Sequence, residues 1–371
     1  MNYIQQQISK SIAWLRFPLV IMVIFIHSGG FGPLAINTHD ITAITGMDMY
    51  NILRMLISRI ICNVAVPAFF AISGYLFFTN LDKWDWNIWR GKIKKRIVTL
   101  LIPYISWNIL RFLFNEFLNI SQKLRHGIDL CSCLEESMSK VSPSIFCNYS
   151  ITDTGYMNWN GVMTMMSVPV HVPFWYVRDL ILLTILSPAI HLTIKHLGGG
   201  ITITLLLTYI LMPFQDIDIR GIVFFTVGGY LSMKVKSFDN KHIEIRKRVL
   251  VLSAVVFLLS AIVNVFFLFL LPVTVLLGMV TLFIAAFYLS EKVYINDTYK
   301  NGSFFIYAFH MFCVIPIGLI YTMSHIEITN VWLLLISYLT MPFVIAALSI
   351  LVYKLVMKSA ILTMILLGKK H

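Results

Sequence analysis

The chain has 371 residues, of which 58% are hydrophobic and only 12% charged, and its mean hydropathy is +0.81. Ordinary soluble domains carry about 25% charged residues, so this composition excludes a soluble protein and indicates an integral membrane protein. The net charge of +12 does not indicate nucleic-acid binding, because the basic residues lie in short segments between apolar runs, where the positive-inside rule accounts for them.

Apolar runs separated by charged or Gly-, Pro- and Asn-containing segments predict about ten membrane-spanning helices. We expect them near residues 11–29, 60–79, 97–116, 172–194, 200–214, 219–233, 249–269, 272–290, 303–323 and 331–355. The predicted fold is all-α, a polytopic helical bundle in which residues 1–371 form a single membrane-embedded domain. The first run is expected to be retained as a helix, because no convincing signal-peptidase site follows it.

The basic residues predict the orientation. Placing the N-terminus in the cytoplasm leaves three of the 29 Lys and Arg residues within spans, Arg16, Arg111 and Arg178, and six outside, Arg54, Arg59, Lys123, Arg125, Lys140 and Arg220. The remaining 20 lie on the cytoplasmic side, which predicts that both termini are cytoplasmic and that the protein lies in the cell (cytoplasmic or inner) membrane.

A polar segment at about 117–170 is expected to be an extracytoplasmic loop. It is rich in Ser, Asn, Thr and Tyr, and a lid or acceptor-binding surface and a tolerated insertion remain equal alternatives. Three of the five cysteines lie here, Cys131, Cys133 and Cys147, where an oxidising compartment would allow two of them to pair. Their spacing is not that of metal ligands, so no metal site is predicted. Cys62 and Cys313 are expected to be buried apolar residues.

His27 lies near the end of the first apolar run, and Arg16 precedes it by eleven residues. A helix turns about 100° per residue, so both side chains point within roughly 20° of one direction, about 16 Å apart along the axis. Ionisable groups in membrane helices usually face a protein interior or a wet cavity where something is bound or moved. We predict that His27 is a general base or a transient acyl acceptor and that Arg16 binds an anionic or carbonyl group. The structural alternatives are a hydrogen-bonded core histidine and an arginine that snorkels to lipid headgroups.

Two further pairs of polar residues fall within apolar runs. Tyr307 and His310 lie three residues apart on one face of the ninth span, and we expect them to line the same cavity unless they make structural hydrogen bonds. Arg178 and Asp179 lie among aromatic residues near the outer end of the fourth span. They either anchor the helix at the membrane interface or hold a polar acceptor.

A basic run precedes the third span and includes Arg90, Lys94 and Arg96. Its main role is expected to be a topology signal and contact with lipid headgroups. A cytoplasmic donor that bears a nucleotide is the second use of such a run, and these three residues are the candidates to bind it.

These features resemble acyltransferase family 3, whose members move acyl groups, mostly acetyl, onto carbohydrates at the cell envelope. The resemblance covers most of the chain. It is carried by Arg16 and His27 and by the segments 69-FFAISGYLFF-78, 95-KRIVTLLIPYISW-107, 174-FWYVRDL-180 and 304-FFIYAFH-310, in that order.

The resemblance implies that His27 is catalytic and Arg16 essential, and that Ser73, Gly74 and Tyr75 shape the cavity, with Ser73 and Tyr75 as substrate-binding candidates. It implies acetyl-CoA, or another acyl-CoA, as the donor substrate and no bound cofactor. The predicted partners are therefore acyl-CoA, a carbohydrate or lipid-linked sugar acceptor and the lipid bilayer. A homo-oligomer and a partner acyltransferase also remain open.

The chain departs from the family pattern in two ways. An acidic residue often precedes the first-helix arginine in the family, whereas Leu15 precedes it here and Pro18 follows within the same turn, so the donor contacts are expected to differ. Many relatives also carry a C-terminal soluble hydrolase-like domain, whereas this chain stops at 367-LGKKH-371. We expect it to act alone or to pass its acyl group to a partner.

The predicted function is a membrane O-acyltransferase that moves an acyl group, most simply acetyl, from acyl-CoA to a hydroxyl of an envelope carbohydrate. The main alternative is a transporter or flippase of polysaccharide or lipid-linked sugar, which would be expected to show internal repeats and Gly- or Pro-broken helices. A receptor-like or scaffold protein is the third interpretation, and it leaves Arg16 and His27 unexplained.

Overall fold

The structure, a computed structural model, describes residues 3–30, 45–79, 81, 84–147, 168–211, 219–235, 247–323 and 330–369. Within these residues every regular element is a helix, in agreement with the predicted all-α class. Two compact units divide the chain, and each is described by itself below. Unit 1 comprises Met1–Asp82, Ile190–Pro213 and Ile222–Leu355, and unit 2 comprises Lys83–Ala189, Phe214–Gly221 and Val356–His371.

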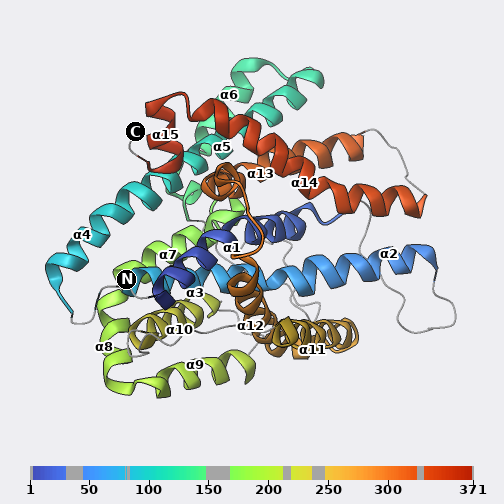
Figure 1. Cartoon of the computed structure of the whole chain (residues 1–371). Coiled ribbons are helices and arrows are strands. Elements are labelled where there is room, and N and C mark those ends of the chain that lie inside the picture. The colour runs from blue at the N-terminus through green and yellow to red at the C-terminus, as the bar shows by residue number, and fades with distance from the viewer. Residues whose placement is uncertain are drawn as a thin grey trace. The chain divides into compact units, whose positions relative to one another are not determined.

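Each helix is assigned to the unit that holds most of its residues (Figure 1). Unit 1 holds α1 (Tyr3–Ser28), α2 (Gly46–Arg54), α3 (Ala65–Phe78), α8 (Ser187–Leu197), α9 (Gly199–Leu211), α10 (Arg220–Val235), α11 (Lys247–Phe266), α12 (Leu271–Leu289), α13 (Asp297–Met323) and α14 (Val331–Val356). Unit 2 holds α4 (Trp86–Arg96), α5 (Ile102–Arg125), α6 (Leu130–Ser139), α7 (Trp175–Ile185) and α15 (Ala360–Leu367).

Each of the ten predicted spans overlaps a helix. Among the described residues, seven helical stretches are long and apolar enough to cross a membrane, or eight if the bent pair α7 and α8 counts as one span. The other two predicted ranges, 200–214 and 219–233, overlap α9 and α10, which have 13 and 16 residues. These helices are shorter than the roughly 20 residues that a bilayer requires.

The predicted fourth span is broken. Helices α7 and α8 meet at an angle of 65°. Pro188 lies at the second position of α8, and a proline has no N–H to donate to the carbonyl four residues earlier. That carbonyl, of Thr184, instead accepts a hydrogen bond from the Ser187 hydroxyl at 2.7 Å. The apolar pattern predicted the range correctly, and the proline explains the bend.

Two predicted spans are parts of longer helical stretches. Residues 46–78 form one stretch of 33 residues, and residues 86–125 form one of 40. Each contains a turn of wider π-helix, at Met55–Ile61 and Ile97–Leu101. The helix through 117–125 also shortens the predicted outer loop, of which residues 130–139 form α6.

Local sequence signals account for several helix ends. At the start of α2, the Thr45 hydroxyl accepts from the Asp48 amide and the Asp48 carboxylate accepts from the Thr45 amide, which forms a capping box. The Asp85 carboxylate caps α4 by accepting from two backbone amides. Gly368, with φ of +62°, ends α15 in the left-handed conformation that favours glycine.

Helix α1 lies at the core of unit 1. It packs against α3, α12 and α13 (Figure 1), and its side chains Leu15, Leu19 and Ile24 are fully buried. Two polar side chains of α1, Gln7 and Ser11, are buried by this packing, whereas Arg16 on the same helix is exposed.

Helices α3 and α10 cross at two glycines. A side chain at Gly74 would collide with the carbonyl group of Phe225, and one at Gly228 would collide with the carbonyl group of Ala71. Small residues at such a crossing let the two backbones approach closely. A hydrogen bond between the hydroxyls of Thr79 and Ser232, at 3.2 Å, extends the same contact.

We expect Gly228→Ala to destabilise the folded protein by about 1 to 3 kcal/mol, because the added methyl group must push two backbones apart. Thermal unfolding in detergent measures the effect. The matched control is Gly91→Ala in α4, where a side chain meets nothing within 4 Å and alanine is the better helix former. An unchanged unfolding temperature for Gly228→Ala would show that the crossing is looser than described.

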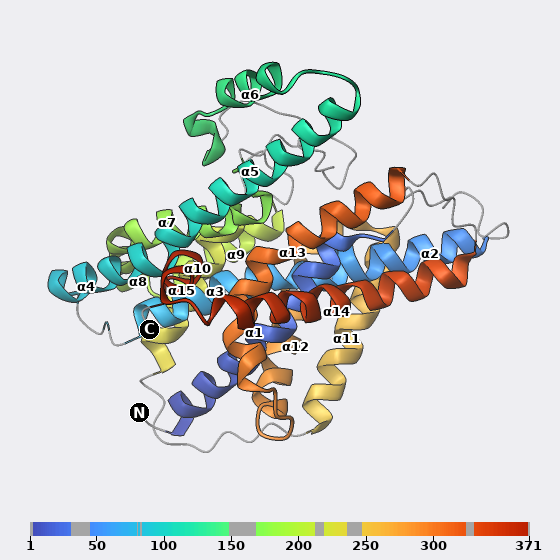
Figure 2. The ribbon, with the colours of Figure 1, turned by 90° about the horizontal axis from the view of Figure 1, so that it is seen from above.

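Helices α5 and α6 form a hairpin in unit 2 (Figure 2). The Asp129 carboxylate caps α6 by accepting from the Ser132 amide at 2.8 Å. Glu136 forms ion pairs with Lys123 of α5 and, at 3.1 Å, with Lys140. Hydrogen bonds from these two lysines hold the pKa of Glu136 below its ordinary value, and the hydrogen bonds from Ser132 lower the pKa of Asp129.

The hairpin is expected to loosen in acid. A carboxyl group whose pKa is lower in the folded than in the unfolded chain stabilises the folded state at pH values above its unfolded pKa, here about 4.3. This stabilisation is lost as the pH falls through the folded pKa. The protection of the α6 amides against hydrogen exchange, measured relative to the intrinsic rate at each pH, should therefore decrease below about pH 4.3. The same experiment on Glu136→Gln should show a smaller decrease in protection, and an equal one would contradict the role of this carboxylate.

Candidate active site

The two first-helix candidates lie on one uninterrupted helix, α1, as predicted. His27 is half-buried near its C-terminal end, and Arg16 is exposed. The neighbours of Arg16 on the inner side of the helix, Leu15, Leu19 and Val20, are at most 1% exposed. The Arg16 side chain is therefore exposed although it lies beside buried residues of the same helix.

The structure brings His310 to His27, although 283 positions separate them in the sequence. The centres of the two imidazole rings are 5.2 Å apart, and the ring planes are inclined by 43°. His310 lies on α13 and is fully buried. We call His27 and His310 the histidine pair.

The hydrogen bonding of His310 defines its tautomer. Its Nδ1 lies 2.6 Å from the backbone carbonyl oxygen of Tyr307. A carbonyl oxygen can only accept, so Nδ1 carries the proton and donates it. In neutral His310 the basic lone pair is therefore on Nε2. The Tyr307 ring centre is 6.2 Å from that of His310, so three of the predicted site residues gather in one place.

Arg59 was not among the predicted site residues. The sequence predicts only that Arg59 is an outer charge, and the structure adds that it lies on the 33-residue helical stretch, in the π-helical turn Met55–Ile61. Its side chain is exposed, and its charge acts on His27. Turns of π-helix are frequent at functional sites, but the sequence carries no strong signal for them.

Ser73 and Tyr75 lie on α3 in unit 1 and are both half-buried. Gly74 between them is the residue that packs against the backbone of α10. The Ser-Gly-Tyr segment therefore has a packing role at its glycine. Binding of substrate by Ser73 and Tyr75 stays a prediction.

The remaining five candidates belong to unit 2. Arg178 donates from Nε to the Asp179 carboxylate at 2.9 Å, and its Nη2 lies 2.8 Å from the same oxygen. Each of these side chains is 21% exposed, and both charges act on the Tyr104 hydroxyl. The two residues thus form a partly accessible ion pair that can offer both a donor and an acceptor to a polar ligand.

The basic candidates lie on α4. Arg90 and Lys94 are exposed and one helical turn apart, whereas Arg96 is half-buried and interacts electrostatically with Tyr176 of α7. Arg90 and Lys94 are therefore the two that a soluble anion can reach most easily.

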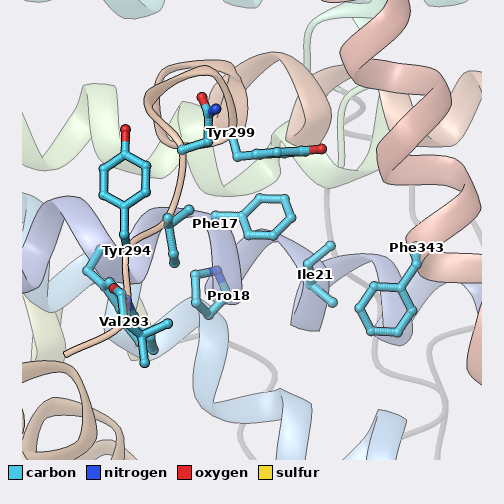
Figure 3. A pocket seen from close by; sticks show the side chains of 10 residues that line it. Phe17, Pro18, Ile21, Val293, Tyr294, Tyr299 and Phe343 are labelled. Atoms are coloured by element: carbon cyan, nitrogen blue, oxygen red, sulfur yellow. The ribbon is translucent and has the colours of Figure 1, made fainter. Parts of the chain in front are cut away.

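An open cavity of about 690 Å³ in unit 1 does not contain the histidine pair (Figure 3). Its walls are mainly aromatic and aliphatic: Trp14, Phe17, Pro18, Ile21, Val293, Tyr294, Ile295, Asn296, Tyr299 and Phe343. At about 100° per residue, the four cavity residues of α1 point about 150° away from Arg16. The cavity therefore lies on the opposite side of α1 from Arg16 and His27, and none of the predicted site residues lines it.

The five cysteines, all within the described residues, form no disulfide bond in the structure. Cys62 is buried, as expected, and Cys313 is half-buried. Of the cysteines in the predicted outer loop, Cys133 is buried and Cys131 exposed. In the described parts of the chain, no cluster of three or more His, Cys, Asp or Glu residues could hold a metal ion.

Comparison with known proteins supplies the family context. A family model described as an acyltransferase domain, that of acyltransferase family 3, matches residues 9–352. The chain is also 23% identical over 255 residues to the succinoglycan biosynthesis protein ExoH of Rhizobium meliloti (strain 1021). That alignment covers 67% of this chain and 61% of the relative, so the chain spans less than two thirds of the relative's length. No solved structure matches the chain.

Proposed function

Because the chain belongs to acyltransferase family 3, we propose that it transfers an acyl group from acyl-CoA to a hydroxyl group of a cell-envelope carbohydrate. The observation that carries the proposal is the histidine pair, with ring centres 5.2 Å apart in an integral membrane protein of this family. Imidazole is the side chain whose ordinary pKa suits proton transfer near neutral pH. Acyl transfer to a hydroxyl requires such a transfer.

Two routes use His27 differently. In the first, His27 takes the proton of the acceptor hydroxyl while the oxygen of that hydroxyl attacks the thioester carbonyl carbon. The carbon–sulfur bond breaks, and the departing CoA thiolate receives that proton. In the second, the His27 nitrogen attacks the thioester carbonyl carbon, the carbon–sulfur bond breaks, and CoA leaves as the thiol with the imidazole proton. The acceptor hydroxyl then attacks the resulting acyl-imidazole, takes the acyl group and returns its proton to His27.

The two routes differ in whether the protein itself becomes labelled. Under the second route, radiolabelled acetyl-CoA without acceptor should label the wild-type chain in a rapid-quench experiment, and His27→Gln should remove the label. If no label appears on a timescale faster than turnover, the first route remains.

In this proposal the phosphates of the donor bind to cationic side chains. Arg16 is exposed and lies about 16 Å from His27 along the axis of α1, a distance that the extended pantetheine arm of CoA can bridge. The exposed Arg90 and Lys94, with Arg96, are the candidates in unit 2. Acetyl is the proposed acyl group, and the acyl-CoA is a substrate, not a resident cofactor.

The proposed acceptor is a polysaccharide or a lipid-linked sugar. A relative named for succinoglycan biosynthesis supports this class of acceptor. The Arg178–Asp179 ion pair, Ser73, Tyr75 and Tyr307 are the proposed polar contacts, since sugar hydroxyls both donate and accept hydrogen bonds. We also propose that the chain crosses the cytoplasmic membrane an even number of times, with both termini cytoplasmic, which the distribution of basic residues supports.

The proposal is tested with membrane vesicles that contain the chain. Acetyl-CoA is added with and without an envelope glycan fraction, and released CoA and ester-linked acetate are measured. CoA should be quantified by chromatography, because the exposed Cys131 would react with a thiol reagent. Release of CoA that depends on the acceptor and equals the amount of ester-linked acetate formed supports the proposal. Transport of glycan with no CoA release would instead support the transporter.

A further inference from the structure

The last turn of α1, which carries His27, is held by side chains of the neighbouring helices. The last four carbonyl groups of a helix have no partner within it, and in a membrane protein such groups must find one elsewhere. The Ser58 hydroxyl donates to the carbonyl oxygen of Phe25 at 2.6 Å, and it lies 2.8 Å from the Tyr338 hydroxyl. Ser58 thus connects α1 to the helical stretch 46–78 two residues before His27.

Arg54 makes the second connection, two and three residues after His27. Its Nε donates to the carbonyl oxygen of Gly29 at 2.5 Å, and its Nη2 donates to that of Gly30 at 3.4 Å. Its Nη1 donates to the Asn51 side-chain oxygen at 3.0 Å, and the guanidinium lies 5.2 Å from the centre of the Tyr50 ring. Arg54 is only 6% exposed, so its donors face protein groups and not a soluble ligand. A cation also interacts favourably with the C-terminal end of the helix dipole.

The backbone at this end of α1 fits the guanidinium closely. Gly29 and Gly30 have φ of +45° and +77°, which favour glycine. A side chain at Gly30 would lie 2.5 Å from the Tyr50 hydroxyl and 2.8 Å from Arg54 Nε. A glycine at position 30 is therefore needed both for the turn and for the approach of Arg54.

We propose that Arg54 is a positioning residue for acyl transfer, which fixes the last turn of α1 and thereby the orientation of the His27 imidazole relative to His310. The inference rests on the proposed acyltransferase function. Arg54 acts on His27 only through the carbonyl groups that follow it. Misplacing a reacting group by about 1 Å can reduce a rate by about 10²-fold, whereas donor binding does not involve Arg54. Its loss should therefore lower kcat and leave the KM for acyl-CoA unchanged.

The test compares Arg54→Gln and Arg54→Lys with the wild-type full chain in detergent. For Arg54→Gln we expect kcat to fall about 10- to 100-fold and the KM for acetyl-CoA to stay within about twofold. Arg54→Lys keeps the charge and one donor nitrogen and should recover part of kcat. A rise in KM with kcat unchanged would overturn the proposal, because it would place Arg54 at the donor. Wild-type kcat in Arg54→Gln would overturn it as well.

A second pair of variants keeps the test decisive if Arg54→Gln fails to fold. Gly30→Ala keeps the arginine at position 54 but adds a methyl group that displaces its side chain from the end of α1. This variant should reproduce the loss of kcat. Gly198→Ala is the matched control, because Gly198 also has a positive φ, +54°, but a side chain there meets nothing within 4 Å. Equal kcat in these two variants would overturn the positioning role. A wild-type chain that releases no CoA would instead refute the proposed function itself.

Discussion

Replacing His27 with glutamine is expected to reduce acyl-CoA turnover by about 10²- to 10⁴-fold, the range that a general acid–base group contributes. Glutamine retains a side chain that can hydrogen-bond but has no basic nitrogen, so both proposed routes lose their reacting atom. The measurement is release of CoA and formation of ester by the purified chain at saturating acetyl-CoA and acceptor.

The matched control for this variant is His196→Gln. His196 is exposed in the last turn of α8 and makes no part of the proposed site, so its replacement should leave turnover unchanged. Thermal unfolding of both variants shows whether the chain is still folded. A folded His27→Gln protein that turns over at the wild-type rate would remove His27 from the mechanism.

Replacing His310 with glutamine is expected to reduce turnover by about 10²-fold, at the lower end of the same range. A glutamine amide can still donate to the Tyr307 carbonyl oxygen, which Nδ1 of His310 now engages. What it cannot replace is the basic Nε2 of a ring that lies 5.2 Å from His27. The loss is therefore attributed to proton handling beside His27 and not to the helix hydrogen bond.

Cys313→Ala is the control on the same helix, one turn beyond His310. Cys313 is a half-buried free thiol, and its replacement should leave turnover within about twofold of the wild type, as for substitutions away from a reacting centre. Full activity in a folded His310→Gln protein would show that the second imidazole is structural. In that case His27 would act without it.

The membrane class and the positions of the helices could be predicted from composition and apolar periodicity. A chain of this hydropathy has to satisfy its backbone polar groups internally, which favours helices. The location of Arg16 and His27 on one helix was also predictable, because the first apolar run is long enough to contain both.

Tertiary relations were not predictable in the same way. The approach of His310 to His27 depends on how α13 packs against α1, and no local pattern in one sequence encodes that contact. The sequence predicted that His310 lines a cavity with Tyr307, but not which residue it would face.

Local features that depart from regular helix were missed for a different reason. Arg54 and Arg59 were predicted only as outer charges, and the structure adds that both lie on the helical stretch 46–78. Arg54 is buried because its donors find backbone carbonyl groups, and Arg59 lies on a π-helical turn. A hydropathy pattern records charge and does not record the partners that allow a charge to be buried.

The central claim is that this membrane protein uses His27 to place acyl esters on an envelope carbohydrate, and analysis of that carbohydrate tests it most directly. The glycan is isolated from a strain that lacks the chain and from the same strain complemented with the wild type or His27→Gln, and its O-acyl esters are measured by NMR. We predict that the esters are absent from the deletion strain, restored by the wild type and not restored by an equally expressed His27→Gln protein. Full restoration by His27→Gln, or an ester content that does not depend on the chain, would contradict the account.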